Sequence, residues 1–388
     1  MKRAVLLPNM VQFPSESMKR YAAELAGALR GLHSADWEFD ELECHHVDRV
    51  ARIVPGEPGK KMASRLGRFV RYPLMASQAG LNQSTSVFHV LDHSHANLTL
   101  SLPRKKAVLT CHDIIPYLAA KKLVPIPAGR ATRYTFPQRI RCMKRCRFVI
   151  AISESTKRDL VEHAHIPEDR VAVVYYGVNR AFRPTDDDTR TCRRTELLQA
   201  HGIPEEARIL LHVGTATRYK NTPTILRALA RLRSDSGLED NTYLLRVGAP
   251  FFDDEEALID SLGIRDRIVH AGKIFDDALL ADYYRSADVF VFPSLWEGFG
   301  WPPLESMACG TPVITSNVAS LPEVVGEGGI TVAPEDLDAF VDAIRRVLTN
   351  PTLRADLRTK AIAQAARFTW EQCALDTLAV YEKVALDS

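Results

Sequence analysis

Two glutamates stand eight positions apart in the stretch FPSLWEGFGWPPLESMACGTPVI, residues 292–314. Glu297 precedes a Gly-Phe-Gly turn, and Glu305 follows a Pro-Pro pair. An ionised carboxylate accepts two hydrogen bonds, which suits the vicinal hydroxyls of a sugar or a ribose. Each glutamate taken alone has an ordinary alternative, Glu305 as a helix-dipole partner and Glu297 as a solvated loop acid.

The residues around the two glutamates predict how they are presented. VFVFPS reads as a buried strand, and the turn Gly298-Phe299-Gly300 lets backbone amides approach a ligand without a side chain between them. The two prolines favour the first turn of a helix, whose amino end then faces the same ligand. We therefore expect both carboxylates to face one bound molecule.

A second loop, HVGTATRYKNTPTILRAL, predicts a site for a diphosphate. Gly214 ends a strand, a helix begins near Thr222, and Arg218 and Lys220 lie between them. Cations and helix amino-terminal amides both attract phosphate, although a surface loop with solvated charges is the alternative. The sequence contains neither G-x-x-x-x-G-K-[ST] nor G-x-G-x-x-G after its first strand, which weakens an NTPase or an NAD-dependent interpretation.

Length and composition predict two globular domains. The chain has 388 residues, of which 46% are apolar and 25% charged. It has no run of 18 apolar residues, and the apolar part of its start is too short for a signal sequence, so we expect a cytoplasmic protein. Seven cysteines without a C-x-x-C pair indicate reduced thiols.

Short runs of Val, Ile and Leu alternate with helical patterns in both halves of the chain. This alternation predicts an α/β protein with two Rossmann-like, doubly wound domains that face a central cleft. The acidic stretch RPTDDD is taken as the linker, which gives domains at residues 1–184 and 185–369. The expected strands are 4–8, 87–91, 106–114, 147–153 and 170–177, then 208–214, 243–248, 267–272, 288–294 and 311–316.

The charge of the chain is unevenly divided. Residues 1–184 carry 29 Lys and Arg against 16 Asp and Glu, a net +13, whereas residues 185–388 carry 21 against 32, a net −11. Residues 60–75, KKMASRLGRFVRYPLM, form a basic amphipathic pattern. The bias predicts an anionic partner for the N-terminal half, such as a membrane surface, with a solvated helix as the alternative.

Taken together, EGFGWPPLE, SMACGTPVI and the upstream Arg218 and Lys220 resemble the retaining glycosyltransferases of family GT4, which have the GT-B fold. CHDIIP, ISESTKRDL, VVYYGV and FTWEQCALDTLAVYEKV resemble further landmarks of that family in the same order. The resemblance implies that a nucleotide sugar binds mainly to the C-terminal domain and the acceptor to the N-terminal one. It also implies that the final helix, about 370–388, completes the N-terminal domain.

The resemblance further implies roles for individual residues. Glu297 would hold the hydroxyls of the donor sugar, Glu305 the ribose and Lys220 the diphosphate. His112 would lie near the donor sugar and the acceptor, and Glu297, His112 and Lys220 are the expected catalytic set. The remaining donor-site residues would be Gly214, Thr215, Arg218, Gly298, Phe299 and Gly300, with Ser15 and Ser17 at a turn that meets phosphate.

Two departures from the family pattern concern the phosphate. Family members often carry Arg directly after the glycine of the diphosphate loop, where this chain has Thr215. Many also have a Gly-Gly pair after the first strand, where this chain reads NMVQFPSESMKRYAAEL. Amides at the start of the helix opened by Ser15 and Ser17 are expected to replace it.

The expected function is therefore retaining transfer of a hexose from a nucleotide diphosphate sugar to a glycan or lipid-linked acceptor in polysaccharide biosynthesis. GDP-mannose is the favoured donor, with UDP-glucose and UDP-N-acetylglucosamine as alternatives. A GT-B-type nucleotide-sugar epimerase, a phosphorylase and a noncatalytic transferase partner remain open. We expect no cofactor, no metal ion and no nucleic-acid partner, and a location on the inner face of the membrane without a spanning helix.

Overall fold

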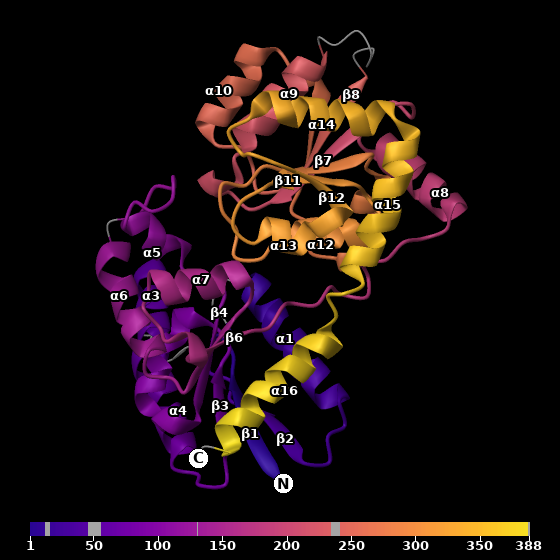
Figure 1. Ribbon diagram of the computed structural model, residues 1–388. Coiled ribbons are helices and arrows are strands. Elements are labelled where there is room, and N and C mark those ends of the chain that lie inside the picture. The colour runs from indigo at the N-terminus through magenta and orange to yellow at the C-terminus, as the bar shows by residue number, and fades with distance from the viewer. Residues whose placement is uncertain (12–15, 46–55, 130, 234–240, 387–388) are drawn as a thin grey trace. The chain divides into compact units, whose positions relative to one another are not determined.

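The computed structural model describes residues 1–11, 16–45, 56–129, 131–233 and 241–386 (Figure 1). The chain forms two compact units. Unit 1 comprises residues 1–177 together with 369–388, and unit 2 comprises residues 178–368. The chain therefore passes from one unit to the other at Gly177 and returns at Thr369.

Unit 1 is built on a parallel sheet of six strands in the order β2-β1-β3-β4-β5-β6. Its central strands are buried along their whole length, because their Val, Ile, Leu and Ala side chains are covered on both faces. The strands are β1 (Lys2–Leu7), β2 (Trp37–Glu41), β3 (Val87–Val90), β4 (Ala107–Cys111), β5 (Phe148–Ala151) and β6 (Val171–Val173).

Seven helices of unit 1 lie in its described residues. Helix α7 begins at a sequence-encoded cap, because Ser153 Oγ accepts a hydrogen bond from the amide of Thr156. A single π-helical segment, Gly67–Arg71, joins α3 to α4. The helices are α1 (Glu16–Gly31), α3 (Glu57–Leu66), α4 (Tyr72–Gly80), α5 (Ile115–Ala120), α6 (Thr132–Met143), α7 (Glu154–Glu162) and α16 (Trp370–Leu386).

Helix α16, the last of the chain, is part of the core of unit 1. It lies beside α1 (Figure 1, yellow). The Tyr381 hydroxyl lies 2.7 Å from Nδ1 of the buried His89, and Trp37 Nε1 donates to Glu382 at 2.5 Å. These bonds reach strands β3 and β2, so the carboxyl-terminal segment stabilises the sheet formed by the first half of the chain.

Unit 2 repeats the architecture with a parallel sheet in the order β12-β11-β10-β7-β8-β9. Its core packs strand residues such as Leu210, Leu244 and Val291 against Leu226 and Phe340 of the covering helices. The strands are β7 (Arg208–Gly214), β8 (Thr242–Gly248), β9 (Ile268–Gly272), β10 (Val289–Phe292), β11 (Val313–Ser316) and β12 (Gly329–Val332).

Acidic or amide side chains begin several helices of unit 2. Asp186, Asp276, Asp336 and Asn350 each accept a hydrogen bond from an amide three residues later, which satisfies an otherwise unpaired donor. The helices are α8 (Asp187–Ala200), α9 (Thr222–Arg233), α10 (Asp253–Leu262), α11 (Asp277–Ser286), α12 (Trp301–Ala308), α13 (Leu321–Val325), α14 (Leu337–Thr349) and α15 (Pro351–Ala365).

The predicted α/β class with two doubly wound domains is confirmed, and all ten predicted strands are present. The RPTDDD stretch differs from expectation, because Asp186 caps α8 and the segment opens a helix instead of linking two domains. The boundary of unit 1 at Gly177 accordingly precedes the predicted one at residue 184.

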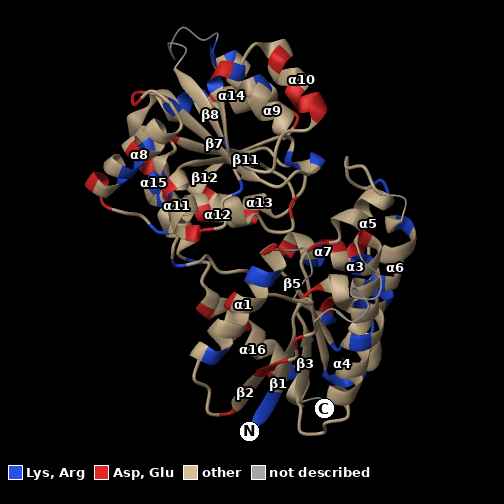
Figure 2. Ribbon diagram, turned by 180° about the vertical axis from the view of Figure 1, so that it is seen from behind, with Lys and Arg blue, Asp and Glu red and all other residues tan. Residues whose placement is uncertain are grey.

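The uneven charge of the sequence is visible in the two units. Figure 2 shows Lys and Arg, in blue, on α6 of unit 1 and Asp and Glu, in red, on α10 of unit 2. In the described part of the chain, no helix combines the length and the apolar character needed to cross a membrane.

Candidate active site

Lys220 and Glu297 form a buried ion pair in unit 2. Lys220 Nζ donates to Glu297 Oε1 at 2.7 Å, and the two residues are only 7% and 8% exposed. The same ammonium lies 4.4 Å from the ring centroid of Phe292. Burying two charges usually costs more than their attraction returns, so such a pair is weak evidence for stability and points instead to a role in a site.

Two further contacts fix the loops that carry this pair. The amide of Leu295 donates to the carbonyl oxygen of Tyr219 at 2.7 Å, which joins the loop before Lys220 to the loop before Glu297. The buried Ser320 Oγ lies 3.0 Å from the carbonyl oxygen of Glu297 and 2.8 Å from that of Phe299. The Gly-Phe-Gly turn is therefore held by a side chain from outside its own sequence.

Glu305 occupies helix α12, whose start matches the sequence-based expectation. Gly300 precedes the helix with φ +110°, a conformation that glycine adopts readily, and the two prolines occupy the first turn. Glu305 is buried and accepts a hydrogen bond from the Tyr284 hydroxyl at 2.9 Å. Both glutamates therefore sit inside unit 2 on rigidly held backbone, and neither is a solvated surface acid.

The loop after β7 contains a close backbone approach. Gly248, at the end of β8, has φ +122°, and a Cβ at this position would lie 2.0 Å from the carbonyl oxygen of Gly214. That carbonyl accepts from the amide of Ala249 at 3.2 Å, and the following Thr215 is exposed. Only glycine at position 248 permits this arrangement of the predicted diphosphate loop.

Arg218 is turned toward an acidic helix. Its Nη1 donates to both carboxylate oxygens of Asp254, at 2.8 and 2.5 Å, and its guanidinium lies 4.1 Å from the ring centroid of Phe252. Its side chain is 47% exposed. The bond to Asp254 raises the pKa of Arg218, which stays charged. Its described contacts do not include Lys220 or Glu297, and its binding of phosphate stays a prediction.

His112 lies at the end of β4 in unit 1 and is buried. Its Nε2 lies 2.9 Å from the carbonyl oxygen of Leu91, and its Nδ1 pairs with the Tyr176 hydroxyl. Burial lowers the pKa of the imidazole, although Asp92 opposes that shift. The neutral ring therefore donates from Nε2 and accepts at Nδ1, so both nitrogens are used within the protein.

Asp92 is the buried acid next to His112. Asn9 Nδ2 donates to it at 2.7 Å and the amide of Ser94 at 2.6 Å. Burial raises the pKa of this carboxyl, but His93, His112 and the two hydrogen bonds outweigh that effect and hold the pKa below its usual value. Nδ1 of His93 lies 3.6 Å from Oδ1 of Asp92. Burial lowers the pKa of the His93 imidazole to about 4. Unit 1 thus carries an ionised acid among neutral imidazoles at neutral pH.

Other predicted residues lie apart from these contacts or outside the described chain. Ser17 is exposed in the first turn of α1, and Ser15 falls outside the described residues.

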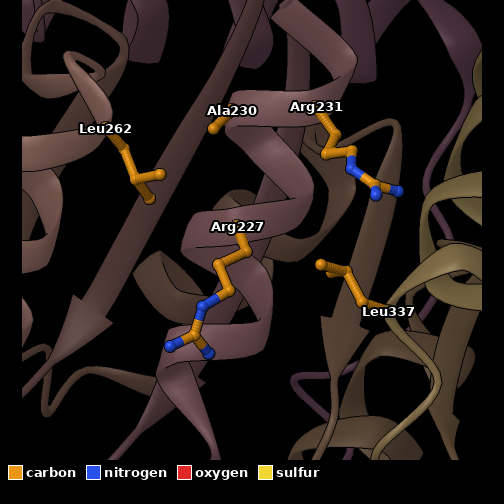
Figure 3. A pocket seen from close by; sticks show the side chains of 5 residues that line it. All are labelled: Arg227, Ala230, Arg231, Leu262 and Leu337. Atoms are coloured by element: carbon orange, nitrogen blue, oxygen red, sulfur yellow. The ribbon is translucent and has the colours of Figure 1, made fainter.

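Within the described ranges, no group of three or more His, Cys, Asp or Glu side chains could hold a metal ion. A separate hollow of about 430 Å³ contains none of the predicted site residues and is lined by Arg227, Ala230, Arg231, Leu262 and Leu337 (Figure 3).

Sequence reasoning missed three residues that bear on the site. Tyr284 contacts Glu305 and Ser320 contacts the backbone of Glu297, but both residues come from other elements. The sequence near the glutamates does not predict these contacts. Arg246 did carry a signal, because a cation stands inside the otherwise apolar strand YLLRVG.

Comparison with known proteins identifies both parts of the chain. Residues 193–364 match the family described as glycosyl transferases group 1, and residues 18–182 match glycosyltransferase family 4. O-antigen chain mannosyltransferase B of Escherichia coli is 26% identical over 98% of this chain and 99% of its own length. The serotype-specific mannosyltransferase WbdA of Escherichia coli is 30% identical over 71% of this chain. The aligned region covers 34% of the length of WbdA.

Solved structures share the fold across the whole chain. Sucrose-phosphate synthase from Thermosynechococcus elongatus aligns over 100% of both chains with a TM-score of 0.75 and 22% identity. Anabaena HepE in complex with UDP and glucose aligns over 98% of this chain and 99% of its own, with a TM-score of 0.70 and 17% identity. The chain thus has the GT-B fold, and the family models and relatives make it a glycosyltransferase. The chain belongs to glycosyltransferase family 4.

Proposed function

We propose that this glycosyltransferase moves a hexose, with retention of configuration, from a nucleotide diphosphate sugar to a glycan or lipid-linked acceptor in polysaccharide assembly. The observation that carries the proposal is the buried pair of Lys220 and Glu297. A diphosphate cation and a sugar-binding carboxylate, held 2.7 Å apart, would meet a nucleotide sugar at the bond that breaks.

The donor site of the proposal lies in unit 2. Glu297 would bind the hydroxyls of the sugar, and Glu305, oriented by Tyr284, would bind the ribose. Lys220 and amides of the Gly-Phe-Gly turn and of the start of α12 would stabilise the diphosphate. Each group would thereby act on a different part of one ligand.

The proposed chemistry breaks the bond between the anomeric carbon and the phosphate oxygen. Negative charge develops on the leaving diphosphate and positive charge on the sugar ring, and Lys220 with nearby amides offsets the former. The acceptor oxygen bonds to the anomeric carbon on the same face, and its proton passes to the departing phosphate. Glu297 is not the nucleophile in this scheme, in which it pairs with Lys220 and binds the hydroxyls of the sugar. A trapped glycosyl adduct on Glu297 would contradict it.

GDP-mannose is the favoured donor in the proposal. Support comes from the mannosyltransferase names of two relatives, one of which aligns along nearly the whole chain. UDP-glucose and UDP-N-acetylglucosamine are the alternatives, since HepE was solved with UDP and glucose. Calorimetric titration of the purified protein with a panel of nucleotide sugars tests this choice. GDP-mannose should bind most tightly, and a protein that binds no nucleotide sugar would overturn the proposed function.

A different class of function is a nucleotide-sugar epimerase or a noncatalytic partner of another transferase. A noncatalytic subunit has no need to keep a costly buried ion pair at the sugar position. An epimerase would change the nucleotide sugar without any acceptor. Dependence of the reaction on an acceptor therefore separates transfer from these alternatives.

Metal independence is a prediction of the same proposal. Because Lys220 and helix amides supply the positive charge at the diphosphate, transfer should continue at an unchanged rate in excess EDTA. The rate of nucleoside diphosphate release, measured with EDTA and with added Mg²⁺ or Mn²⁺, checks this expectation. Complete loss of activity that either ion restores would show that a metal completes the site.

We further propose that α3, the π-helical segment and α4 bind the surface of an anionic membrane. Large apolar side chains are exposed along this segment, at Met62, Leu66, Phe69, Val70 and Leu74. Exposed Lys60, Lys61 and Arg65 accompany them. Anionic headgroups attract each nearby Lys or Arg by about 1 kcal/mol, and the apolar side chains would insert between them.

Sedimentation with liposomes tests the membrane surface. The protein should sediment with vesicles containing phosphatidylglycerol at low salt and be released as ionic strength rises. Changing Lys60, Lys61 and Arg65 together to Gln should abolish sedimentation, whereas the same change at Arg193, an exposed arginine of unit 2, should not. Arg68 is left intact because it donates to the carbonyl oxygen of Ser94. Equal binding to neutral vesicles would contradict the proposal.

A further inference from the structure

Arg246 is a buried guanidinium of unit 2 that has no hydrogen-bond or ion-pair partner among the described residues. The residue is 2% exposed and lies on strand β8, between β7 and the edge strand β9 of the parallel sheet. Its Nε and Nη1 are enclosed and make no hydrogen bond, whereas Nη2 is not among the enclosed atoms. In the described part of the chain, no carboxylate forms an ion pair with it. A charge buried in this way is costly unless something pairs with it.

The neighbours of Arg246 compensate its charge only in part. The negative charge of Glu255 attracts Arg246 and raises its pKa. That carboxylate also accepts a hydrogen bond from the amide of Phe252, which caps α10. The ring centroid of Phe251 is 5.9 Å away, near the limit for a cation–π contact. Burial lowers the pKa of Arg246 to about 10, so the group remains charged at neutral pH.

The position of Arg246 connects it to the diphosphate loop. It is in register with His212 of β7, two pairs before Gly214 and Gly248. A Cβ built on Gly214 would lie 3.4 Å from Arg246 Nη1, 3.5 Å from His212 Nε2 and 3.8 Å from Lys220 Cδ. Three basic side chains from three positions thus converge beside one glycine, and only Lys220 among them has a carboxylate partner.

His212 adds no second charge to this cluster. Its Nδ1 lies 2.9 Å from the carbonyl oxygen of Val291, which makes Nδ1 the donor of the ring. Burial, with Arg246 and Lys220 nearby, holds the pKa of His212 well below its ordinary value, so the ring is neutral. Lys220 is paired with Glu297, so Arg246 is the charged member of this cluster that has no ion pair among the described residues.

We propose that Arg246 is the second cation that binds the diphosphate of the donor, in the role that the sequence assigned to Arg218. This inference rests on the proposed function, because it presumes a nucleotide diphosphate ligand at the Gly214 loop. Arg218 is held by Asp254, whereas Arg246 lies beside Gly214 and forms no ion pair with a described carboxylate. A phosphate oxygen there would receive charge-assisted hydrogen bonds from the planar guanidinium and relieve its buried charge.

A binding measurement on Arg246→Met tests the assignment. The affinity for GDP and for inorganic pyrophosphate should fall about 10- to 100-fold, as expected for loss of a charge-assisted hydrogen bond, while the affinity for guanosine stays unchanged. Arg231→Met is the matched control, because Arg231 is an exposed arginine of the same unit, paired with Asp338. It should bind all three ligands like the wild type.

Thermal unfolding without ligand separates binding from a structural role. Removing an unpaired buried charge should leave the unfolding midpoint of Arg246→Met equal to or above that of the wild type. A lower midpoint together with equal losses of affinity for GDP and guanosine would overturn the assignment.

If Arg246→Met does not fold, Arg246→Lys is the second variant, because it keeps the charge but not the planar guanidinium. It must still weaken the binding of GDP and pyrophosphate relative to that of guanosine. Unchanged GDP affinity in the folded variant refutes the role of Arg246 alone, whereas a wild type that binds neither GDP, UDP nor pyrophosphate refutes the proposed function as well.

Discussion

The variant Glu297→Gln should keep its fold and its affinity for the nucleoside diphosphate but lose most of its transfer activity, about 10- to 100-fold in rate. The estimate corresponds to one charge-assisted hydrogen bond to the sugar. The amide oxygen of Gln still accepts from Lys220 Nζ, so the packing around the pair is retained. Single-turnover rates and titration with GDP measure the two effects separately.

Glu305→Gln is the matched comparison, because it makes the same chemical change at the other carboxylate. If Glu305 binds the ribose, this variant should mainly weaken nucleotide affinity and leave the rate at saturating donor near that of the wild type. Glu305 contacts Tyr284 and not Lys220 in the described bonds, which is why the two effects should separate. Full activity in Glu297→Gln would refute the role given to that residue.

Gly248→Ala should be the most disruptive single-methyl substitution near the site. The added Cβ would lie 2.0 Å from the carbonyl oxygen of Gly214, a backbone atom that cannot move without shifting the loop, and φ +122° is unfavourable for alanine. Overpacking and backbone strain each cost about 1 to 3 kcal/mol, so the free energy of unfolding should fall by about 2 to 6 kcal/mol. Urea unfolding followed by circular dichroism measures the loss.

Gly263→Ala provides the control for backbone strain alone. Gly263 also has a positive φ, +63°, but a Cβ there would have no neighbour within 4 Å. Its cost should be limited to about 1 kcal/mol, the usual penalty for a left-handed conformation. Equal losses in the two variants would show that the contact with Gly214 does not constrain the diphosphate loop.

Most of the fold could be predicted because buried parallel strands are continuous apolar runs. Strands β2 and β12 were missed, and both lie at an edge of their sheets. The sequence of β2, WEFDE, carries three acids, since an edge strand needs only one buried face. Strand β12, GITV, is four residues long and follows a glycine-rich turn, which reads as a loop.

The candidate site was predictable only where its residues are close in sequence or follow a known spacing. The start of α12 follows from two prolines and a glycine, and the structure places it as expected. The partners of the glutamates depend on tertiary packing, because Tyr284 belongs to α11 and Ser320 precedes α13. Arg218 was assigned from sequence position alone, and its bond to Asp254 could not be foreseen.

The central claim is acceptor-dependent glycosyl transfer by the site at Lys220 and Glu297. Its most direct test measures release of nucleoside diphosphate from GDP-mannose, and from the UDP-sugars, with and without a lipid-linked oligosaccharide acceptor. We predict rapid release only when the acceptor is present, one glycoside formed per diphosphate released, and the anomeric configuration of the donor retained in the product. Conversion of the nucleotide sugar without acceptor, or a product of inverted configuration, would contradict the account.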